Sequence, residues 1–167
     1  HARRFPTPIS EDLFDVISHA LQISKLTKGS FDVTRRKNGY KKIILDRENQ
    51  TLFIKDPDFA IDLGGIGKGY ALDRAADYMK LNGVKSARLN FSGNILVIGT
   101  PPENDKWIVE DRSARKIELS YNAISRSSHA NNPGHIINPK TQKPVTHQKS
   151  ATIIAPNATL ADALSTA

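Results

Sequence analysis

Glycines crowd the stretch Asp62–Asp73, which reads DLGGIGKGYALD and holds Gly64, Gly65, Gly67 and Gly69 within six residues. An apolar segment precedes it and a helical pattern follows, so we predict a strand, a tight glycine turn and then a helix. Backbone N–H groups and a helix N-terminus at such a point favour a phosphate or another anion. The alternative is a strand-to-helix connection that needs its glycines for packing alone.

A carboxylate and a hydroxyl lie four positions apart in the last stretch, LADALSTA, as Asp162 and Thr166. On a helix this spacing stacks the two side chains on one face. Both are hard oxygen donors of the kind that suits Mg²⁺. The same spacing also occurs on solvated helix faces that bind no metal, so it leaves both alternatives open.

One histidine lies in a motif-like segment, His135 in GHIINPKTQKPVT. It could serve as a general base or as a hydrogen-bond partner of a phosphate, and a purely structural histidine is an equal alternative. The segment Asn90–Asn94, NFSGN, either places a backbone amide against a ligand or simply joins two strands. Neither known nucleotide motif fits the glycine stretch: Lys68 precedes Gly69 rather than Ser or Thr, and no GxGxxG fingerprint is present.

Composition narrows the classes of function. The 167 residues are 38% hydrophobic and 25% charged, as in ordinary globular proteins, with a net charge of +7. The absence of cysteine excludes disulfides, cysteine nucleophiles and thiolate metal sites. A basic protein suits an anionic partner, but the densest basic run is only Arg35-Arg36-Lys37 and no nucleic-acid motif accompanies it. The opening HARRFPTPIS has no apolar core of a signal peptide, which is consistent with a mature or trimmed start.

Hydrophobic periodicity and turn residues predict the secondary structure. A polar loop is expected over 125–134. The predicted helices begin after Ser10, at Gly69 and near Thr159 after an Asn157 cap, and the predicted strands span 31–34, 41–45, 51–54, 60–63, 86–91, 95–98, 107–109, 116–119 and 151–154.

Four segments taken in order resemble the ApbE family, the FAD:protein FMN transferases. They are GSFDVT from Gly29, DLGGIGKGYALDRAA from Asp62, GHIINPKTQKPV from Gly134, and ATIIAPNATLADALSTA from Ala151. A weaker match, RLNFSGNILVIG, corresponds to the family's NLGGD-containing hairpin. For the fold, the resemblance implies an α+β protein with mixed or antiparallel sheets and helices packed against them. We expect one domain over residues 1–167, and an arrangement in two lobes stays open.

The resemblance also implies a chemistry. Members of the family bind FAD and Mg²⁺ and transfer the FMN half of FAD to a threonine hydroxyl of an acceptor protein, releasing AMP. The implied roles are FAD contacts for Asp62, Lys68 and Ile137, Mg²⁺ ligation for the Gly65 carbonyl and the side chains of Asp162 and Thr166, and catalysis for His135 and Asp162, with His135 as base or phosphate partner.

The chain departs from the family pattern in several places. Family members are longer, and we expect the N-terminal flavin-contacting region and the C-terminal end to be incomplete here. The segment after Thr34 and the segment 107–115 are abbreviated. We expect the departures to affect the flavin pocket more than the metal site; the substituted positions are Ser92, Asn94, Asn138 and Gln142.

Four hypotheses follow. The first is Mg²⁺-dependent protein flavinylation, with an acceptor protein that is a subunit of a flavin-dependent redox complex. The alternatives are an Mg²⁺-dependent FAD pyrophosphatase that yields FMN and AMP, a flavin-binding module without catalysis, and a basic nucleic-acid binder. The resemblance implies a bacterial cell-envelope location, as a periplasmic protein or an outward-facing lipoprotein anchored by a segment outside this sequence, with the cytoplasm as the alternative.

Overall fold

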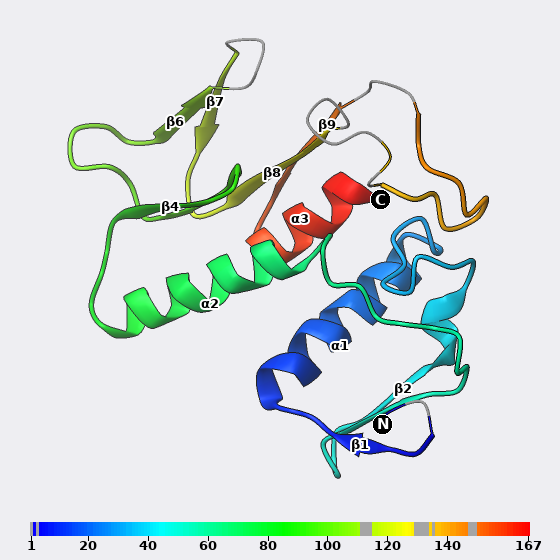
Figure 1. The fold of residues 1–167 in the computed structure, drawn as a ribbon. Helices are drawn as coiled ribbons and strands as arrows, with labels where there is room; N and C mark the ends of the chain where they lie inside the picture. The colour runs from blue at the N-terminus through cyan, green and yellow to red at the C-terminus, as the bar shows by residue number, and fades with distance from the viewer. Residues whose placement is uncertain (1, 3, 111–114, 129–133, 135, 147–149) are drawn as a thin grey trace. The chain divides into compact units, whose positions relative to one another are not determined.

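A computed structural model describes the protein at residues 2, 4–110, 115–128, 134, 136–146 and 150–167. The fold is α+β, as the resemblance implies (Figure 1). The chain divides into two compact units. The first unit comprises His1–Ile66, Ser128–Ser150 and Thr166–Ala167, and the second comprises Gly67–Ser127 and Ala151–Ser165.

The first unit contains the helix α1, Glu11–Leu26, which confirms the predicted amphipathic helix. The Ser10 side chain accepts a hydrogen bond from the Leu13 N–H at 3.3 Å, so the predicted cap is present. After the C-cap residue Thr27, Lys28 and Gly29 both adopt left-handed backbone conformations, with φ of +52° and +78°. The chain therefore leaves α1 through two consecutive left-handed residues, where the sequence predicted one glycine.

A three-stranded antiparallel sheet accompanies α1, in the order β1-β3-β2. The predicted hairpin is confirmed, with its first residues diverted into a short 3₁₀ helix. Figure 1 shows α1 lying over this sheet. The bounds are Thr7–Pro8 for β1, Gly39–Lys42 for the 3₁₀ helix η1, Ile43–Asp46 for β2 and Thr51–Ile54 for β3. The buried apolar side chains of these elements are Phe14, Val16, Ile17, Ala20, Ile23, Ile43, Leu52 and Ile54.

The strand predicted over 31–34 is wrong, because the segment forms turns. The buried carboxylate of Asp32 accepts hydrogen bonds from the Thr34 N–H at 3.0 Å and the Thr34 hydroxyl at 2.7 Å, and from the Tyr40 N–H at 3.2 Å. An aspartate that binds backbone two residues on competes with the strand ladder. The apolar pattern therefore marks buried residues here, without a strand.

The strand predicted over 60–63 is also wrong, since those residues have no regular structure. One backbone hydrogen bond joins this segment to the earlier one, from the Asp62 N–H to the Val33 carbonyl at 2.7 Å. The Asp62 carboxylate then accepts from the Gly64 N–H at 2.8 Å. This side-chain turn ends the extended segment before a ladder forms.

The second unit contains a four-stranded sheet, a two-stranded hairpin and two helices. The four strands lie in the order β4-β5-β8-β9, and β6 pairs with β7. The bounds are Gly67–Leu81 for α2, Ala87–Phe91 for β4, Asn94–Ile98 for β5, Trp107–Glu110 for β6, Lys116–Leu119 for β7, Ala123–Ser128 for β8, Ser150–Ala155 for β9 and Ala158–Thr166 for α3.

Every residue of β5 is buried, because both faces of this strand are covered. On one face, Leu96 and Ile98 pack with residues of α2 and α3. On the other face, Ile95 and Val97 pack with the β6-β7 hairpin. Figure 1 shows the helices and the hairpin on these two sides of the sheet. Strand β5 is therefore the centre of this unit's core.

Two loop predictions in this unit need correction. The β4-β5 turn consists of Ser92 and Gly93, with φ of +53° and +90°, so Asn94 belongs to β5 and not to the turn. The polar loop predicted over 125–134 begins as strand β8, which runs to Ser128. Ser125 and Ser127 of this strand are polar but form hydrogen bonds inside the unit, and a pattern based on hydrophobicity misses such a strand. Residues 129–133 lie outside the described residues.

The predicted turn is present over residues 64–66, where the Ile66 N–H donates to the Leu63 carbonyl at 3.0 Å. The glycines of the stretch 62–73 act there through close approach rather than through left-handed backbone. None of Gly64, Gly65, Gly67 and Gly69 has a positive φ, and α2 already begins at Gly67. A Cβ placed on Gly69 would lie 2.2 Å from the Ala158 carbonyl oxygen of α3. The missing side chain lets the two helices meet at their backbones.

We predict that Gly69→Ala destabilises the protein by about 2 kcal/mol, because overpacking outweighs the better helix propensity of alanine. The measurement is the free energy of unfolding in urea.

The matched control is Gly83→Ala, where φ is +82° and no atom lies within 4 Å of the added Cβ. This change introduces only left-handed strain, about 1 kcal/mol. A smaller loss at Gly69 than at Gly83 would show that the α2–α3 contact can relax around a methyl group.

Candidate functional site

Asp162, on the second turn of α3, is the most buried of the sequence-predicted functional side chains that the structure describes. Its Oδ2 accepts a hydrogen bond from the Gly69 N–H at 2.9 Å. Its Oδ1 lies 3.6 Å from Lys68 Nζ, and the Lys68 side chain is 37% exposed against 4% for Asp162. Both partners belong to the first turn of α2, where the helix dipole favours a negative charge. The site thus holds a buried carboxylate between a helix N-terminus and a cation.

A second contact, within the first unit, joins two of the predicted metal ligands. A Cβ placed on Gly65 would lie 3.2 Å from Thr166 Cγ2 and 3.2 Å from Phe31 Cε2. This spacing is tighter than ordinary van der Waals contact, so a glycine is what lets the backbone approach Thr166 this closely. Thr166 follows Asp162 by four positions on α3, as the spacing predicted.

The direction of α3 is fixed at its N-terminus by Asp73 of α2. The Asp73 carboxylate accepts from the N–H groups of Ala158 and Thr159, each at 2.8 Å, and also from the Thr159 hydroxyl. Asn157 accepts from the Leu160 N–H at 2.8 Å, which confirms the predicted cap. A helix of nine residues is marginal alone, so these bonds decide where Asp162 lies.

Sequence reasoning did not identify Asp73 as a site-building residue. The available signal was its position four residues after Gly69, which puts both on one face of α2. Its partners on α3 lie 85 and 86 positions further along the chain.

The predicted FAD contact Asp62 lies in the first unit and forms an ion pair with Arg35. The Arg35 Nη1 to Asp62 Oδ2 distance is 3.1 Å, with side-chain exposures of 45% and 44%. Exposed pairs of this kind contribute about 0–1 kcal/mol to stability. The pair therefore leaves Asp62 accessible to solvent without holding the fold together.

The predicted flavin neighbour Ile137 lies in a compact turn of the first unit, where it bridges Pro144. The Asn138 side chain accepts from the N–H groups of Lys140 and Thr141, at 2.9 and 3.2 Å. This turn is held by its own asparagine, as expected of an Asn-Pro sequence. The predicted base His135 lies outside the described residues.

That turn is also tied to the loop after Thr34. Gln142 has φ of +58°, a left-handed conformation at the position where the family resemblance expects glycine. Its Oε1 accepts a hydrogen bond from Arg36 Nη1 at 3.0 Å. The Gln142 side chain, which a glycine at this position would not have, thus forms a contact within the first unit.

The donor set offered by these residues suits a hard divalent cation. A carboxylate, a hydroxyl and a backbone carbonyl are all oxygen ligands of the kind that Mg²⁺ takes. A carboxylate has about four lone-pair positions, so the Gly69 N–H bond leaves Asp162 with acceptor capacity. Among the described residues no group of three or more His, Cys, Asp or Glu side chains gathers.

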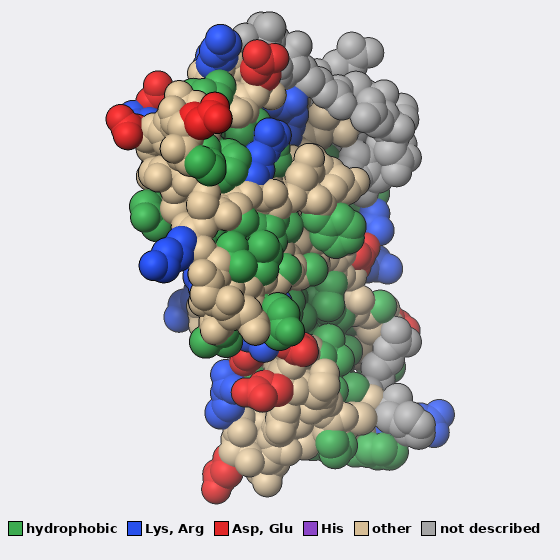
Figure 2. Space-filling model, turned by 90° about the vertical axis from the view of Figure 1, so that its left-hand side faces the viewer, with side chains coloured by type: hydrophobic (Ala, Val, Ile, Leu, Met, Phe, Trp, Pro, Cys, Tyr) green, Lys and Arg blue, Asp and Glu red, His purple; other side chains and the backbone are tan. Residues whose placement is uncertain are grey.

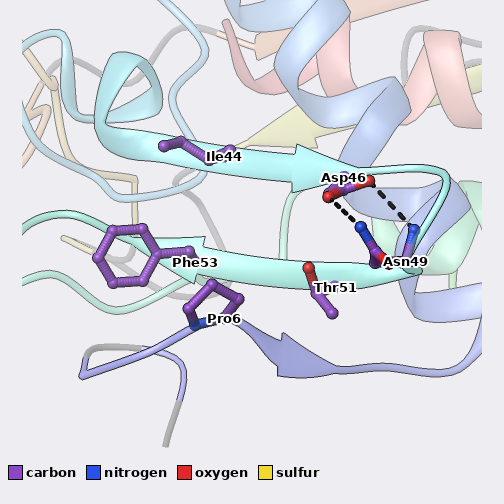
Figure 3. A pocket seen from close by; sticks show the side chains of 6 residues that line it. All are labelled: Pro6, Ile44, Asp46, Asn49, Thr51 and Phe53. Carbon is purple, nitrogen blue, oxygen red and sulfur yellow. Dashed lines mark hydrogen bonds between the residues drawn. The ribbon is translucent and has the colours of Figure 1, made fainter.

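A cavity of about 400 Å³ lies elsewhere in the first unit, on the sheet face shown in Figure 3. None of the sequence-predicted site residues lines it. Asn49 donates two hydrogen bonds to Asp46 across its rim, and these lower the pKa of the Asp46 carboxyl. Its lining residues are Pro6, Ile44, Asp46, Asn49, Thr51 and Phe53.

Comparison with known proteins identifies the family. The family model for ApbE matches residues 34–167, which is most of the chain. The chain belongs to the ApbE family. This confirms the resemblance carried by the four ordered motifs.

Relatives named FAD:protein FMN transferase are similar over nearly the whole chain. The protein from Salmonella typhimurium is 26% identical over 210 residues, covering 97% of this chain and 60% of the relative. The one from Haemophilus influenzae is 26% identical and covers 96% and 60%. The chain thus spans about 60% of the length of the relatives it matches. An alignment of 210 positions on 167 residues also means that these relatives carry insertions.

Solved structures of ApbE proteins share the fold. The ApbE protein from Thermotoga maritima superposes with a TM-score of 0.88 at 28% identity, covering 98% of this chain and 67% of the other. The flavinyl transferase ApbE of Pseudomonas stutzeri gives a TM-score of 0.86 at 21% identity. These matches confirm the predicted α+β ApbE fold. The roles of individual site residues stay predictions.

We predict that Asp73→Ala lowers the free energy of unfolding by about 2 kcal/mol, at the upper end of the range for a lost helix cap. The physical reason is that the N–H groups of Ala158 and Thr159 lose their acceptor. Urea denaturation gives the measurement.

The control is Asp77→Ala, one turn further along α2. Asp77 is 59% exposed and lies 3.5 Å from Lys80 Nζ, so its loss is expected to change stability by less than about 0.5 kcal/mol. Equal effects of the two substitutions would contradict the capping role of Asp73.

Proposed function

We propose that this protein transfers FMN from FAD to a threonine hydroxyl of an acceptor protein, with AMP as the other product and Mg²⁺ as the required ion. The support is the family membership together with the names of relatives that cover nearly all of this chain. The observation that carries the proposal is the buried Asp162, held by the Gly69 N–H and faced by Lys68. A buried carboxylate beside a partly exposed lysine suits a reaction on phosphate groups.

The proposed reaction forms one bond and breaks one bond. The threonine oxygen attacks the phosphorus on the flavin side of the FAD pyrophosphate, and the bond from that phosphorus to the AMP oxygen breaks. The hydroxyl proton passes to a base, for which the family motif proposes His135. The product is a phosphoester between FMN and the acceptor.

We assign Mg²⁺ to the Gly65 carbonyl and the side chains of Asp162 and Thr166. When bound, the ion would neutralise negative charge on the phosphate oxygens. The chain's own contributions are separate. Gly69 keeps the Asp162 carboxylate oriented through its N–H, and Gly65 brings the backbone close to Thr166. Lys68 supplies positive charge at the start of α2.

The flavin contacts are assigned to Asp62, Lys68 and Ile137. Asp62 is well exposed, and one of its carboxylate oxygens is taken by Arg35 while the other accepts the Gly64 N–H. Ile137 offers an apolar side chain on a turn that is held rigid by Asn138. These features suit hydrogen bonding and apolar contact with an aromatic nucleotide.

The partner we propose is an acceptor subunit of a flavin-dependent redox complex, and the place is the bacterial cell envelope, with the cytoplasm as the alternative. Among the described helices none is long and apolar enough to cross a membrane. On the face drawn in Figure 2, Lys and Arg side chains are interspersed with Asp and Glu. A nucleic-acid binder uses a continuous basic stripe instead of such a mixture, so this face gives no support to the nucleic-acid alternative.

We predict that the protein, incubated with FAD, Mg²⁺ and an acceptor protein, increases the acceptor mass by one FMN group and releases AMP. Asp162→Asn is expected to reduce the rate by about 100-fold, equivalent to several kcal/mol of lost charge stabilisation. Intact-mass spectrometry and AMP release provide the two measurements.

The control is Asp77→Asn, an exposed aspartate of α2, which should retain full activity. Thermal unfolding of both variants checks that they fold. FMN and AMP without acceptor labelling would favour the pyrophosphatase, and bound FAD without any product would favour the inactive module. Undiminished transfer by a folded Asp162→Asn protein would refute the assignment of the ion to this residue.

A further inference from the structure

A buried hydrogen-bond network joins the centre of the second unit to the turn of α3 that carries Asp162. Its side chains are Asn94 on β5, Ser125 on β8 and Ser165 on α3, with exposures of 2%, 1% and 4%. The Ser125 hydroxyl contacts the Asn94 amide group and lies 3.1 Å from Ser165 Oγ. Ser165 Oγ in turn lies 2.9 Å from the Asp162 carbonyl oxygen and 2.9 Å from Ser127 Oγ. The network thus ends on the backbone of the proposed metal ligand.

Counting protons shows that the orientation of the Asn94 amide matters. If Asn94 Oδ1 accepts from Ser125, three hydroxyl protons must supply the four contacts given above, and the buried Nδ2 has no partner among the described residues. Turning the amide moves Oδ1 into that partnerless position, so the proton count, and not the orphaned atom, separates the two orientations. If the amide is turned so that Nδ2 faces Ser125, the amide adds the missing proton and every contact has its own donor.

We propose that Asn94 is a positioning residue that donates from Nδ2 to Ser125, so that Ser125 donates to Ser165 and Ser165 donates to the Asp162 carbonyl. Each member then gives one proton in the same direction. Ser127 supplies the fourth, toward Ser165 Oγ. A side chain that only accepts, such as a carboxylate, would reverse this order and leave the Asp162 carbonyl without its side-chain donor.

The consequence concerns the metal ligands of the proposed function, on which this inference rests. The network holds the last turn of α3 from the sheet side, while Asp73 holds its first turn. Groups that orient a metal ligand from behind typically change metal affinity by about 10–100-fold when they are removed. We therefore expect the network to set the affinity for Mg²⁺ more than the rate at saturating Mg²⁺.

The first experiment fixes the direction of the chain without any ligand. In protein labelled with ¹⁵N-asparagine, the side-chain amide protons of Asn94, assigned by their disappearance in Asn94→Asp, should give NOEs to the Ser125 Hβ protons. The opposite orientation turns those protons away from Ser125. Absence of these NOEs, with the Asn94 amide signals observed, would overturn the proposal.

The second experiment separates positioning from simple stability. Mg²⁺ alone is titrated while the melting temperature is followed, since an ion that binds the native state raises it. Ser165→Ala is expected to need about tenfold more Mg²⁺ for the same rise, and about tenfold more for half-maximal FMN transfer. Its transfer rate at saturating Mg²⁺ should stay within about twofold of the wild type.

The matched control is Ser24→Ala. Ser24 is also fully buried and donates to a carbonyl of its own helix, Ala20, at 2.8 Å, but it belongs to α1. It should lose stability and keep the wild-type Mg²⁺ requirement. An unchanged Mg²⁺ requirement in Ser165→Ala would overturn the positioning role. A wild-type melting temperature that does not respond to Mg²⁺ would overturn the proposed ion site and the positioning role together, and the NOEs would still decide the direction of the chain.

Discussion

The close approach of α2 to α3 at Gly69 is the constraint on which the second unit depends. Because Gly69 has no side chain, its backbone reaches the Ala158 carbonyl region, and its N–H reaches the Asp162 carboxylate at 2.9 Å. One helical turn later, Asp73 takes the free N–H groups at the start of α3. Two adjacent turns of α2 thus fix both the position and the direction of a short helix.

Small side chains make this contact an apolar one as well. Ala76 of α2 and Ala158 and Ala161 of α3 are buried with Leu96 and Ile98 of β5 in one cluster. Alanine at these positions keeps the helices near the sheet, while the serines of the buried network add directional bonds at the other end of α3. A helix too short to be stable alone is therefore held at each end by hydrogen bonds and along its length by packing.

Elements with a clear periodicity followed from the sequence. The helix α1, the helix α2 and the hairpins β2-β3 and β4-β5 were predicted because their apolar spacing and turn residues agree with one another. The strand predictions for residues 31–34 and 60–63 were wrong because Asp32 and Asp62 accept hydrogen bonds from neighbouring backbone N–H groups and turn the chain. Hydrophobic alternation reports burial in both cases, and it does not report what the aspartates do.

The sequence analysis missed strand β8 for a different reason. Its serines look like loop residues, yet Ser125 is buried and bonded to Asn94 and Ser165, which lie 31 and 40 positions away. A polar residue can occupy a core when a distant partner satisfies it, and the partner is not visible in a local window. The same limit applies to Asp73 and its partners on α3, which the sequence motifs contained but did not connect.

The candidate site shows most clearly what sequence reasoning could and could not supply. The glycine stretch was predicted to favour an anion, and an anion does lie at the start of α2, but it is the protein's own Asp162. Since the Gly69 N–H is taken by that carboxylate, a phosphate cannot use the same donor. The helix N-terminus instead holds a negative group in place, and a negative group so held attracts a cation.

The way Asp162 is held at the start of α2 also bears on the spacing of Asp162 and Thr166. Four positions on a helix are compatible with a solvated face, whereas a carboxylate on such a face would not be buried beside a partly exposed lysine, as Asp162 is beside Lys68. Asp162 is buried because Gly69, 93 positions earlier in the chain, and the alanines of α3 allow the helices to pack closely. The residue types proposed for the chemistry were therefore readable from the sequence, whereas the burial of Asp162 required the close backbone approach that Gly69 permits.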